Sequence, residues 1–196
     1  MKFLAVGDIH GDVDLARELS KRANEEKVDF VVICGDISGS GDEGFEGVMG
    51  LFKQKVFLVP GNHDSDATIN FLAEMYKGKN LEGYGYKLGD VGLFGCGSVN
   101  LGMFQKTEGE IFELLSRGAK YTDDCRKRIL VSHVHPADSK MEVFGWEGSV
   151  GLKKAIDEFK PDFVLCSHLH EADGIEEKIG STKVINVGRK GKIVEV

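Results

Sequence analysis

The sequence contains little proline and no long apolar run. Only 3 of its 196 residues are proline, and no proline-rich, serine-rich or single-residue tract suggests a linker between domains. The apolar run at residues 3–6 stops before Asp8 and is too short for the core of a signal peptide or for a membrane span. We therefore expect one globular domain over residues 1–196, a cytoplasmic location and no membrane partner.

Paired cysteines and an excess of basic residues are also missing. No Cys-x-x-Cys pair occurs among Cys34, Cys96, Cys125 and Cys166, so we expect reduced, structural thiols. The formal net charge is −7, whereas affinity for duplex nucleic acid depends on clustered Lys and Arg side chains that neutralise phosphates. The glycine-rich stretch 39–47 lacks the Gly-Lys-Ser/Thr ending of a P-loop. The sequence thus disfavours a nucleic-acid partner and a P-loop nucleotide site.

The first half of the chain alternates between apolar runs and helical patterns. Strands are expected at 2–6, 28–34 and 56–59. Helices are expected after Asp12, which is a good N-cap, and at 65–76, with a weaker helix near 45–52. Repeated strand-then-helix units predict a largely parallel sheet.

The second half of the chain has a different pattern. Residues 84–88 and 91–95, joined by Gly89-Asp90, predict a hairpin. Helices are expected at 107–119 and 148–159, and strands at 128–132, 162–166, 175–179, 183–187 and 192–196. The short C-terminal strands follow one another quickly, so we expect them to be antiparallel and to belong to a second sheet.

Side chains that commonly bind metals follow these apolar runs over most of the chain. They are Asp8, His10, Asp36, Asn62, His63, Asp64, His133, His168 and His170. Strands placed side by side bring their carboxyl ends to one edge of a sheet, so residues far apart in sequence can meet there. Neutral imidazoles suit Zn, Mn, Fe or Ni better than Ca. The pattern predicts a binuclear metal site.

Two of these groups are spaced as alternating pairs. If the preceding strand continues, Asp8 and His10 point the same way, and His168 and His170 repeat that geometry. A single Asp-x-His pair also occurs by chance, or in the first turn of a helix with both side chains solvated. The second pair favours the metal interpretation.

Two further motifs offer a bridging ligand and a free imidazole. Asp36 follows Gly35 at a strand end, where its two carboxylate oxygens could bridge a pair of ions. In Gly61-Asn62-His63-Asp64, the Asn62 amide oxygen can bind a metal while His63 remains available for proton transfer, with a carboxylate behind it. This run is the most informative of the sequence.

In order, spacing and strand-end placement, these motifs resemble the calcineurin-like metallophosphoesterase superfamily over nearly the whole chain. The resemblance implies an α/β fold, a four-layer αββα sandwich of two mixed β-sheets flanked by helices. It implies that the first metal is bound by Asp8, His10, Asp36 and His170. It implies that the second metal is bound by Asp36, Asn62, His133 and His168, with Asp36 bridging the two.

The resemblance also implies how catalysis proceeds. His63 would lie beside the substrate phosphate and either protonate the leaving oxygen or stabilise its charge, and Asp64 would orient the His63 imidazole. Two divalent ions, roughly 3.5–4 Å apart, would clamp the phosphoryl oxygens and lower the pKa of a bridging water toward ~7. The resulting hydroxide would attack phosphorus in line with the leaving oxygen. The expected substrate contacts are Asn62, His63 and, as a further candidate, His135.

The segment His133-Val134-His135-Pro136 offers two imidazoles. We choose His133 as the ligand because it directly follows the strand at 128–132 and matches the family's position. His135, next to Pro136, belongs to a turning segment and is expected to be a loop or substrate-side residue. On a glycine-rich loop further along, Trp146 either walls the substrate pocket or lies half buried against the sheet.

Two positions depart from the family's pattern. Ser167 stands where the family usually has Gly before the final His-x-His, which matters only if that backbone needs a positive φ. Near the C-terminus, Asn186-Val187-Gly188-Arg189 replaces an Asn-Pro-Gly-Ser-like ending of some small bacterial and archaeal members. Arg189 is then either a phosphate contact or a surface cation.

Together these features predict a phosphoric ester hydrolase that depends on two divalent transition metal ions (Mn, Fe, Zn or Ni), with Mn favoured. Its substrate would be a small phosphate ester, with phosphodiesters, cyclic nucleotides among them, somewhat favoured over phosphomonoesters. The alternative is a catalytically weak or inactive protein of the same fold that serves as a protein-interaction scaffold. Retention of every expected ligand argues against the scaffold, and the acidic charge disfavours a nuclease. The sequence predicts no particular oligomeric state.

Overall fold

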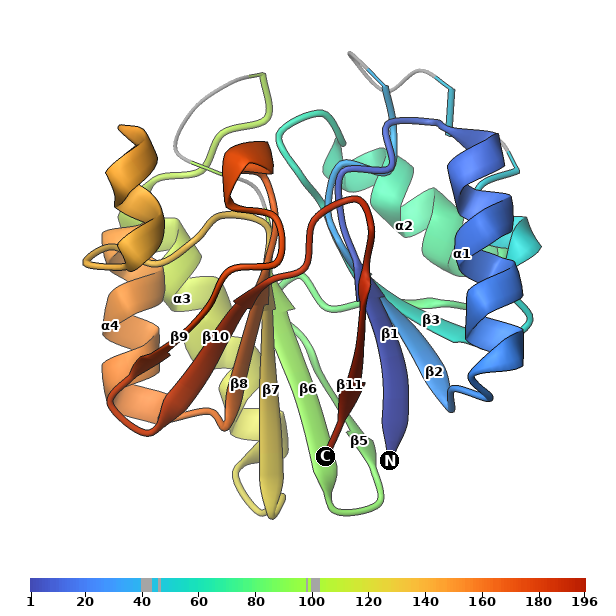
Figure 1. The fold of residues 1–196 in the computed structure, drawn as a ribbon. Helices are drawn as coiled ribbons and strands as arrows, with labels where there is room; N and C mark the ends of the chain where they lie inside the picture. Colours follow the sequence, from blue (N-terminus) through green and yellow to red (C-terminus); the bar gives the residue numbers. More distant parts are fainter. Residues whose placement is uncertain (40–43, 46, 98, 100–102) are drawn as a thin grey trace.

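Two β-sheets facing each other, with helices on both outer faces, make up the protein (Figure 1). The computed structural model describes residues 1–39, 44–45, 47–97, 99 and 103–196. Most of the centre of the glycine-rich stretch 39–47 lies outside the described residues. The predicted four-layer αββα sandwich of two mixed sheets is confirmed.

The first sheet has the strand order β11-β1-β2-β3-β4. Its members are β1 (Lys2–Val6), β2 (Phe30–Cys34), β3 (Lys55–Val59), β4 (Lys79–Asn80) and β11 (Lys192–Glu195). Neighbours from β1 to β4 are parallel, and β11 pairs antiparallel with β1. The prediction that the last strand joins the second sheet is therefore wrong, because a short alternating pattern does not specify which free edge the strand will pair with. The sequence pattern also missed β4, which is only two residues long.

The second sheet has the strand order β5-β6-β7-β8-β10-β9. Its members are β5 (Gly85–Leu88), β6 (Val91–Cys96), β7 (Lys127–Ser132), β8 (Phe163–Cys166), β9 (Glu176–Ile179) and β10 (Thr182–Asn186). The four inner strands are parallel, whereas β5 and β9 are antiparallel edge strands. The predicted hairpin of β5 and β6 and the antiparallel pairing of β9 with β10 are confirmed.

In the part of the chain that the structure describes, four α-helices cover the outer faces (Figure 1). They are α1 (Val13–Glu25) and α2 (Asp66–Met75) on the first sheet, and α3 (Glu108–Ala119) and α4 (Val150–Phe159) on the second. Each begins at a polar side chain that accepts a hydrogen bond from a backbone N–H of the first turn. These N-caps are Asp12, Ser65, Thr107 and Ser149.

Short 3-10 turns complete the helical structure. They lie at Met49–Leu51, Lys120–Thr122, Lys140–Phe144 and His170–Ala172. In the described part of the weak helix predicted near 45–52, only the first of these turns forms, and Gly47 nearby has a left-handed φ of 82° that opposes a helix. None of the helices formed by the described residues is both long and apolar enough to cross a lipid bilayer.

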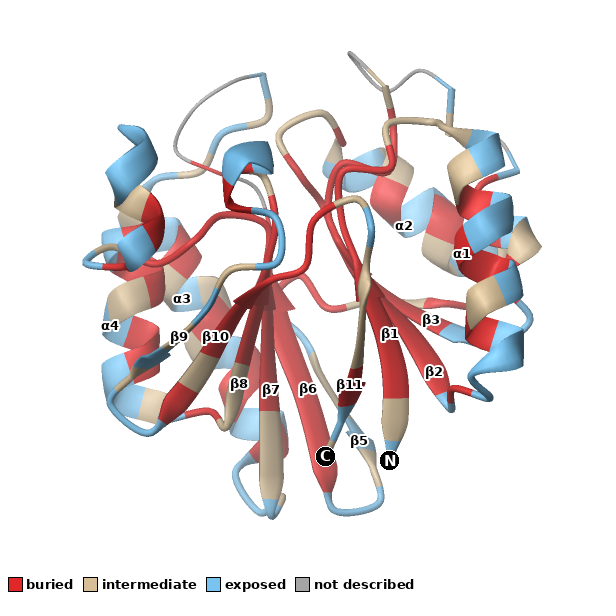
Figure 2. Cartoon of the chain, viewed as in Figure 1, coloured by how far each residue is buried: buried red, intermediate tan, exposed pale blue. Residues whose placement is uncertain are grey.

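Consecutive strand residues alternate between two cores. In β1, Phe3 and Ala5 face the opposite sheet, whereas the residues between and after them pack toward the helices. Phe30 and Phe57 extend the layer between the sheets, with ring centroids 4.7 Å (Phe3 to Phe30) and 5.5 Å (Phe30 to Phe57) apart. Figure 2 shows that the strands are largely buried and the outer helix faces exposed. This packing holds the carboxyl ends of the parallel strands in fixed positions for the loops that follow them.

Candidate metal centre

The loops that follow β1, β2, β3, β7 and β8 come together beyond the carboxyl ends of these strands, where the two sheets lie next to each other (Figure 1). Among the described residues, three groups of side chains each place one potential ligand atom per residue within 4.8 Å of the others. The groups are Asp8, His10 and His170; His10, Asp36 and His63; and Asp36, His133 and His168. Because His10 and Asp36 each belong to two groups, the three form one continuous cluster.

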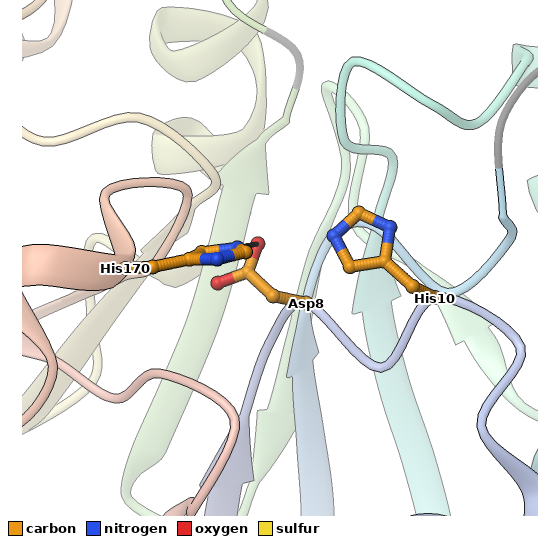
Figure 3. Close-up of side chains that lie close together, drawn as sticks. All are labelled: Asp8, His10 and His170. Atoms are coloured by element: carbon orange, nitrogen blue, oxygen red, sulfur yellow. Dashed lines mark ion pairs between the residues drawn. The ribbon is translucent and has the colours of Figure 1, made fainter.

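Asp8 connects the loop after β1 with the loop after β8. Figure 3 shows its carboxylate directed toward the His170 ring, and Oδ1 lies 3.8 Å from His170 Nε2. The same carboxylate accepts the backbone N–H of His168, at 3.1 Å from Oδ2 and 3.3 Å from Oδ1. Asp8 is buried, whereas His170 is exposed. This part of the cluster is therefore open to solvent on the His170 side.

Asp36 lies at the centre of the cluster. Its Oδ2 is 3.6 Å from Nε2 of His10 and 3.4 Å from Nε2 of His133. Its Oδ1 accepts the backbone N–H of His63 at 2.9 Å. The backbone of Gly61 approaches so closely that a Cβ there would lie 2.0 Å from Asp36 Oδ1, which explains why glycine occupies this position. One carboxylate thus faces imidazoles of two different groups.

His133 supplies the opposite side of the cluster. Its Nε2 is 3.0 Å from Oδ1 of Asn62, and its ring lies edge to face with that of His168, with centroids 4.9 Å apart. Its Nδ1 is 2.7 Å from the backbone carbonyl oxygen of Cys34. A carbonyl oxygen can only accept, so Nδ1 carries a proton and Nε2 is the nitrogen directed at the cluster. This is the orientation in which a histidine can use Nε2 as a metal ligand.

His63 lies on the His10 side of the cluster. The two rings are edge to face, with centroids 5.0 Å apart and an interplanar angle of 87°. His63 is half-buried, and one of its ring nitrogens belongs to the group with His10 and Asp36. The imidazole can therefore serve chemically either as a ligand or as a proton donor next to the cluster.

The backbone, rather than the pleat of a strand, aims four of these side chains. Asp8, His10, Asp36 and His168 have left-handed φ values of 53°, 51°, 50° and 65°. The prediction that strands continue through Asp8 and His10 and through His168 and His170 is wrong, because β1 ends at Val6 and β8 at Cys166. Such conformations cost on the order of 1–3 kcal/mol each in residues other than glycine. They are held in place by backbone hydrogen bonds, among them that from the N–H of His10 to the Asp36 carbonyl at 2.9 Å.

Asp64 is buried beneath the cluster and contacts backbone amides. Its carboxylate accepts the N–H groups of Ile37 (3.2 Å), Ser38 (2.8 Å) and Gly61 (2.9 Å). The predicted role of Asp64 in orienting the His63 ring has no supporting hydrogen bond among the described residues. Its contacts instead join the loop after β2 to the loop after β3.

The contacts of His135 differ from those of its neighbour His133. His135 is only 1% exposed, and its Nε2 lies 3.3 Å from the backbone carbonyl of Trp146. Its Nδ1 is buried and has no hydrogen-bond partner among the described residues. The side chain of Trp146 is 51% exposed. His135 thus lies in the loop after β7, and its buried ring contacts the Trp146 loop.

Arg189 lies beside the loop that carries His10. Its guanidinium donates to Asp12 Oδ2 at 2.9 Å, and its backbone N–H donates to Asp173 at 3.3 Å. Asp12 also caps α1 through Oδ1. The guanidinium therefore has a carboxylate partner in this structure, which fits the interpretation as a surface cation better than that of a free phosphate contact.

Sequence reasoning missed two groups that support the cluster. One is the backbone carbonyl of Cys34, which accepts from His133; a backbone atom leaves no sequence signal. The other is the hydroxyl of Ser167, which donates to the same carbonyl at 2.7 Å. Only the departure from the family's usual glycine at that position gave a hint of it.

Burial and neighbouring charges shift the pKa values of the cluster in opposite directions. Burial raises the pKa of Asp8 to about 6 and lowers that of His168 to about 3. Burial also lowers the pKa of His10. For His133, burial opposes the charged form, but the charge and hydrogen bond of Asp36, the charge of Asp8 and the Cys34 carbonyl together outweigh it and raise the pKa to about 9. Burial likewise opposes the charge of Asp36, but the charge and hydrogen bond of His133, with the backbone N–H of His63 and the charge of His10, together hold its pKa well below the usual range.

The donor set fits divalent transition metals. It combines two buried carboxylates, an amide oxygen and several imidazoles, which are ligands suited to Mn, Fe, Zn or Ni. Burial keeps His10 and His168 in the neutral form that metals require. The raised pKa of Asp8 shows that protein charges alone do not compensate this buried carboxylate, so a nearby cation would stabilise its ionised form.

Comparisons with known proteins found a matching sequence profile and solved structures of similar fold. The sequence profile described as calcineurin-like phosphoesterase matches residues 1–172. No curated protein matches the chain in sequence. Among solved structures, TT1561 of Thermus thermophilus superposes with a TM-score of 0.79 at 14% identity, covering 98% of this chain and 97% of that one.

Two further solved structures share the fold. A dimetal phosphatase from Danio rerio has a TM-score of 0.62 at 16% identity, with 96% of this chain and 87% of that one covered. A structure described as a novel archaeal phosphodiesterase has a TM-score of 0.55 at 16% identity, with 96% and 84% covered. At these identities the superpositions establish the fold, and the functions of these proteins remain their own.

The pKa shifts predict how the stability of the chelated protein depends on pH. The folded pKa of His133, raised by Asp36 to about 9, lies above the ordinary value of 6.5, so its contribution is present below pH 6.5 and lost as pH rises through 9. Burial raises the pKa of Asp8 from 3.8 to about 6, so Asp8 contributes a loss of stability as pH rises from 3.8 to 6. The pKa of His168, lowered by burial from 6.5 to about 3, has the opposite effect over this range, because the unfolded state then binds the extra proton. Urea unfolding in chelator should therefore show its clear loss of stability between pH 6.5 and 9.

His133→Gln is the control for this prediction. The variant should lose the upper decline between pH 6.5 and 9, and saturating manganese should remove the same decline in the unmodified protein because the ligand proton is displaced. An unchanged upper decline in His133→Gln would contradict the assignment.

Proposed function

Because this chain belongs to the calcineurin-like phosphoesterase family, a family of phosphoric ester hydrolases, we propose that it hydrolyses small phosphate esters with two divalent transition metal ions. Residues 1–196 would act as one phosphoesterase domain, and manganese is the favoured metal. Phosphodiesters are favoured over phosphomonoesters, because small members of this fold include phosphodiesterases. Cyclic nucleotides are among the candidate phosphodiester substrates.

The position of Asp36 Oδ2 carries the proposal. This oxygen lies 3.6 Å from Nε2 of His10 and 3.4 Å from Nε2 of His133, two imidazoles on opposite sides of the cluster. A carboxylate that faces two sets of nitrogen ligands suits a pair of neighbouring ions, whereas a mononuclear site does not need one. Paired ions are a common arrangement for phosphoryl transfer.

The proposed ligands divide between two positions that share Asp36. The first position would use Asp8, His10, Asp36 and His170, and the second Asp36, Asn62, His133 and His168. When bound, the ions supply Lewis-acid activation of a water nucleophile and neutralise charge on the phosphoryl oxygens. The buried amide contacts of Asp64 keep the two loops that carry Asp36 and Asn62 at a fixed spacing.

The chain's own proton donor would be His63. Its half-buried ring stands beside His10 at the rim of the cluster, where it can reach a substrate that the deeper imidazoles cannot. We assign it the transfer of a proton to the leaving-group oxygen, or stabilisation of charge there. Asn62 and His63 would contact the phosphate, whereas the burial of His135 leaves it an indirect part through the Trp146 loop.

A scaffold without hydrolytic activity is the alternative from another class. A scaffold has no need to retain carboxylates and imidazoles in left-handed backbone conformations, yet the cluster keeps four such residues. The geometry therefore favours an enzyme.

Activity against a panel of esters tests the function directly. Nitrophenyl monoesters and diesters and cyclic nucleotides should be hydrolysed in the presence of added Mn²⁺ and not in chelator, with diesters turned over faster. Asp36→Asn should abolish turnover in every case, because it removes the shared ligand charge. A manganese-loaded protein that hydrolyses none of these esters would support the scaffold instead.

Metal content tests the ligand assignment. The protein should hold about two ions per chain, and Asp36→Ala should lose the most because this residue serves both positions. His133→Ala should empty or weaken the second position only. His135→Ala is the matched control, two residues away, and should keep both ions. Elemental analysis and anomalous scattering measure occupancy, and loss of an ion in the His135 variant alone would show that the other imidazole is the ligand.

Leaving-group dependence tests the role of His63. His63→Ala should keep normal metal content yet slow turnover by about 10²–10⁴, the range expected for lost acid–base catalysis. The loss should shrink for nitrophenyl esters, whose leaving groups need little protonation. Steady-state kinetics on good and poor leaving groups make the comparison. Equal losses would restrict His63 to charge stabilisation, and a lost ion would make it a ligand.

A further inference from the structure

We infer that Ser167 is a positioning residue for His133, and that position 7 is glycine because the two positions share one side-chain space. The inference rests on the proposed function, since it concerns the orientation of a proposed ligand. Ser167 replaces the glycine that the family usually carries before its final His-x-His. Its backbone does not require glycine, because Ser167 is not among the residues with positive φ.

Ser167 contacts His133 at two points. Its backbone N–H donates to the His133 carbonyl at 2.9 Å, and its hydroxyl oxygen lies 3.1 Å from His133 Nδ1. The hydroxyl donates to the Cys34 carbonyl at 2.7 Å, and the same carbonyl lies 2.7 Å from His133 Nδ1. Hydroxyl, ring nitrogen and carbonyl therefore form a closed triangle of fully buried groups.

This triangle determines which edge of the imidazole faces the cluster. The second side-chain torsion of histidine is broad, so the ring needs external contacts to fix it. With Nδ1 held by the carbonyl and the hydroxyl beside it, Nε2 points at Asn62 Oδ1, 3.0 Å away. A flipped ring would place a carbon atom against the carbonyl and lose that hydrogen bond. Groups behind a metal ligand commonly tune its affinity in this way.

Gly7 leaves the space that the Ser167 side chain fills. An ideal Cβ on Gly7 would lie 2.3 Å from Oγ and 2.4 Å from Cβ of Ser167, so both positions cannot carry side chains. The same Cβ would lie 3.4 Å from the Cys34 carbonyl oxygen. A hydroxyl carried by position 7 would thus reach the same acceptor if position 167 were glycine.

Zinc titration of Ser167→Ala tests the positioning role. Calorimetry should show about 10–100-fold weaker binding of the second Zn²⁺, the usual effect of losing a group behind a ligand, with the first ion unchanged. Ser132→Ala is the matched control, because Ser132 directly precedes His133, is buried, and has no hydrogen-bond partner for its hydroxyl among the described residues. The control should bind zinc like the unmodified protein.

The exchanged pair Gly7→Ser with Ser167→Gly tests the shared space. This double variant should recover zinc affinity to within a few-fold of the unmodified protein, whereas Gly7→Ser alone should be strongly destabilised by collision with Ser167. Thermal unfolding in chelator establishes which variants fold. A folded double variant that binds zinc as weakly as Ser167→Ala would overturn the shared space.

Equal zinc affinity of Ser167→Ala and the unmodified protein would overturn the positioning role, as would equal weakening in the Ser132 control. If the unmodified protein takes up no metal, the proposed function fails. Nitrogen-15 NMR of the metal-free protein then still tests whether Ser167 positions the His133 ring. The Nδ1 proton of His133 should exchange slowly with water and should exchange at least tenfold faster in Ser167→Ala. Equal exchange rates would overturn it.

Discussion

The structure depends on the burial of two carboxylates, Asp8 and Asp36, where the loops of both sheets meet. A buried carboxylate without compensation is costly, and protein groups compensate the two unequally. Asp36 has the charge of His133 beside it, whereas the Asp8 pKa rises to about 6 through burial. The surrounding imidazoles, amides and loop conformations are arranged around this unbalanced charge. A pair of cations would balance it, which is the physical basis of the proposed metal site.

Buried hydrogen bonds behind the cluster hold its side chains and loops in place. Asp64 accepts three backbone amides from two loops, and the Cys34 carbonyl orients His133 with help from Ser167. The amide contacts of Asp64 lie directly after Asp36, whose left-handed conformation an isolated loop would avoid. Folding of the sandwich in this way fixes the positions of the proposed ligands without an ion, an arrangement that would favour tight and specific binding.

Two neighbouring imidazoles illustrate how the tertiary structure separates similar residues. His133 and His135 are two positions apart, and both are buried. The first faces Asp36 and Asn62, whereas the second contacts the carbonyl of Trp146. The choice of His133 came from its place after a strand, and the contacts support that choice. The buried position of His135 was not foreseen, because the sequence does not show that a later loop folds over it.

Sequence patterns were sufficient to predict most strands, the helix starts and which residues are candidates for the metal site, whereas the sandwich of two mixed sheets came from the family resemblance. These predictions rest on periodic apolar residues, capping side chains and short motifs, which act over a few neighbouring positions. The patterns did not reveal that β11 returns to the first sheet, that left-handed turns aim Asp8 and His168, or that Asp64 binds backbone amides. Those features depend on contacts between residues far apart in the chain. They result from the packing of the two sheets and their loops, because this packing brings particular backbone groups within hydrogen-bond distance.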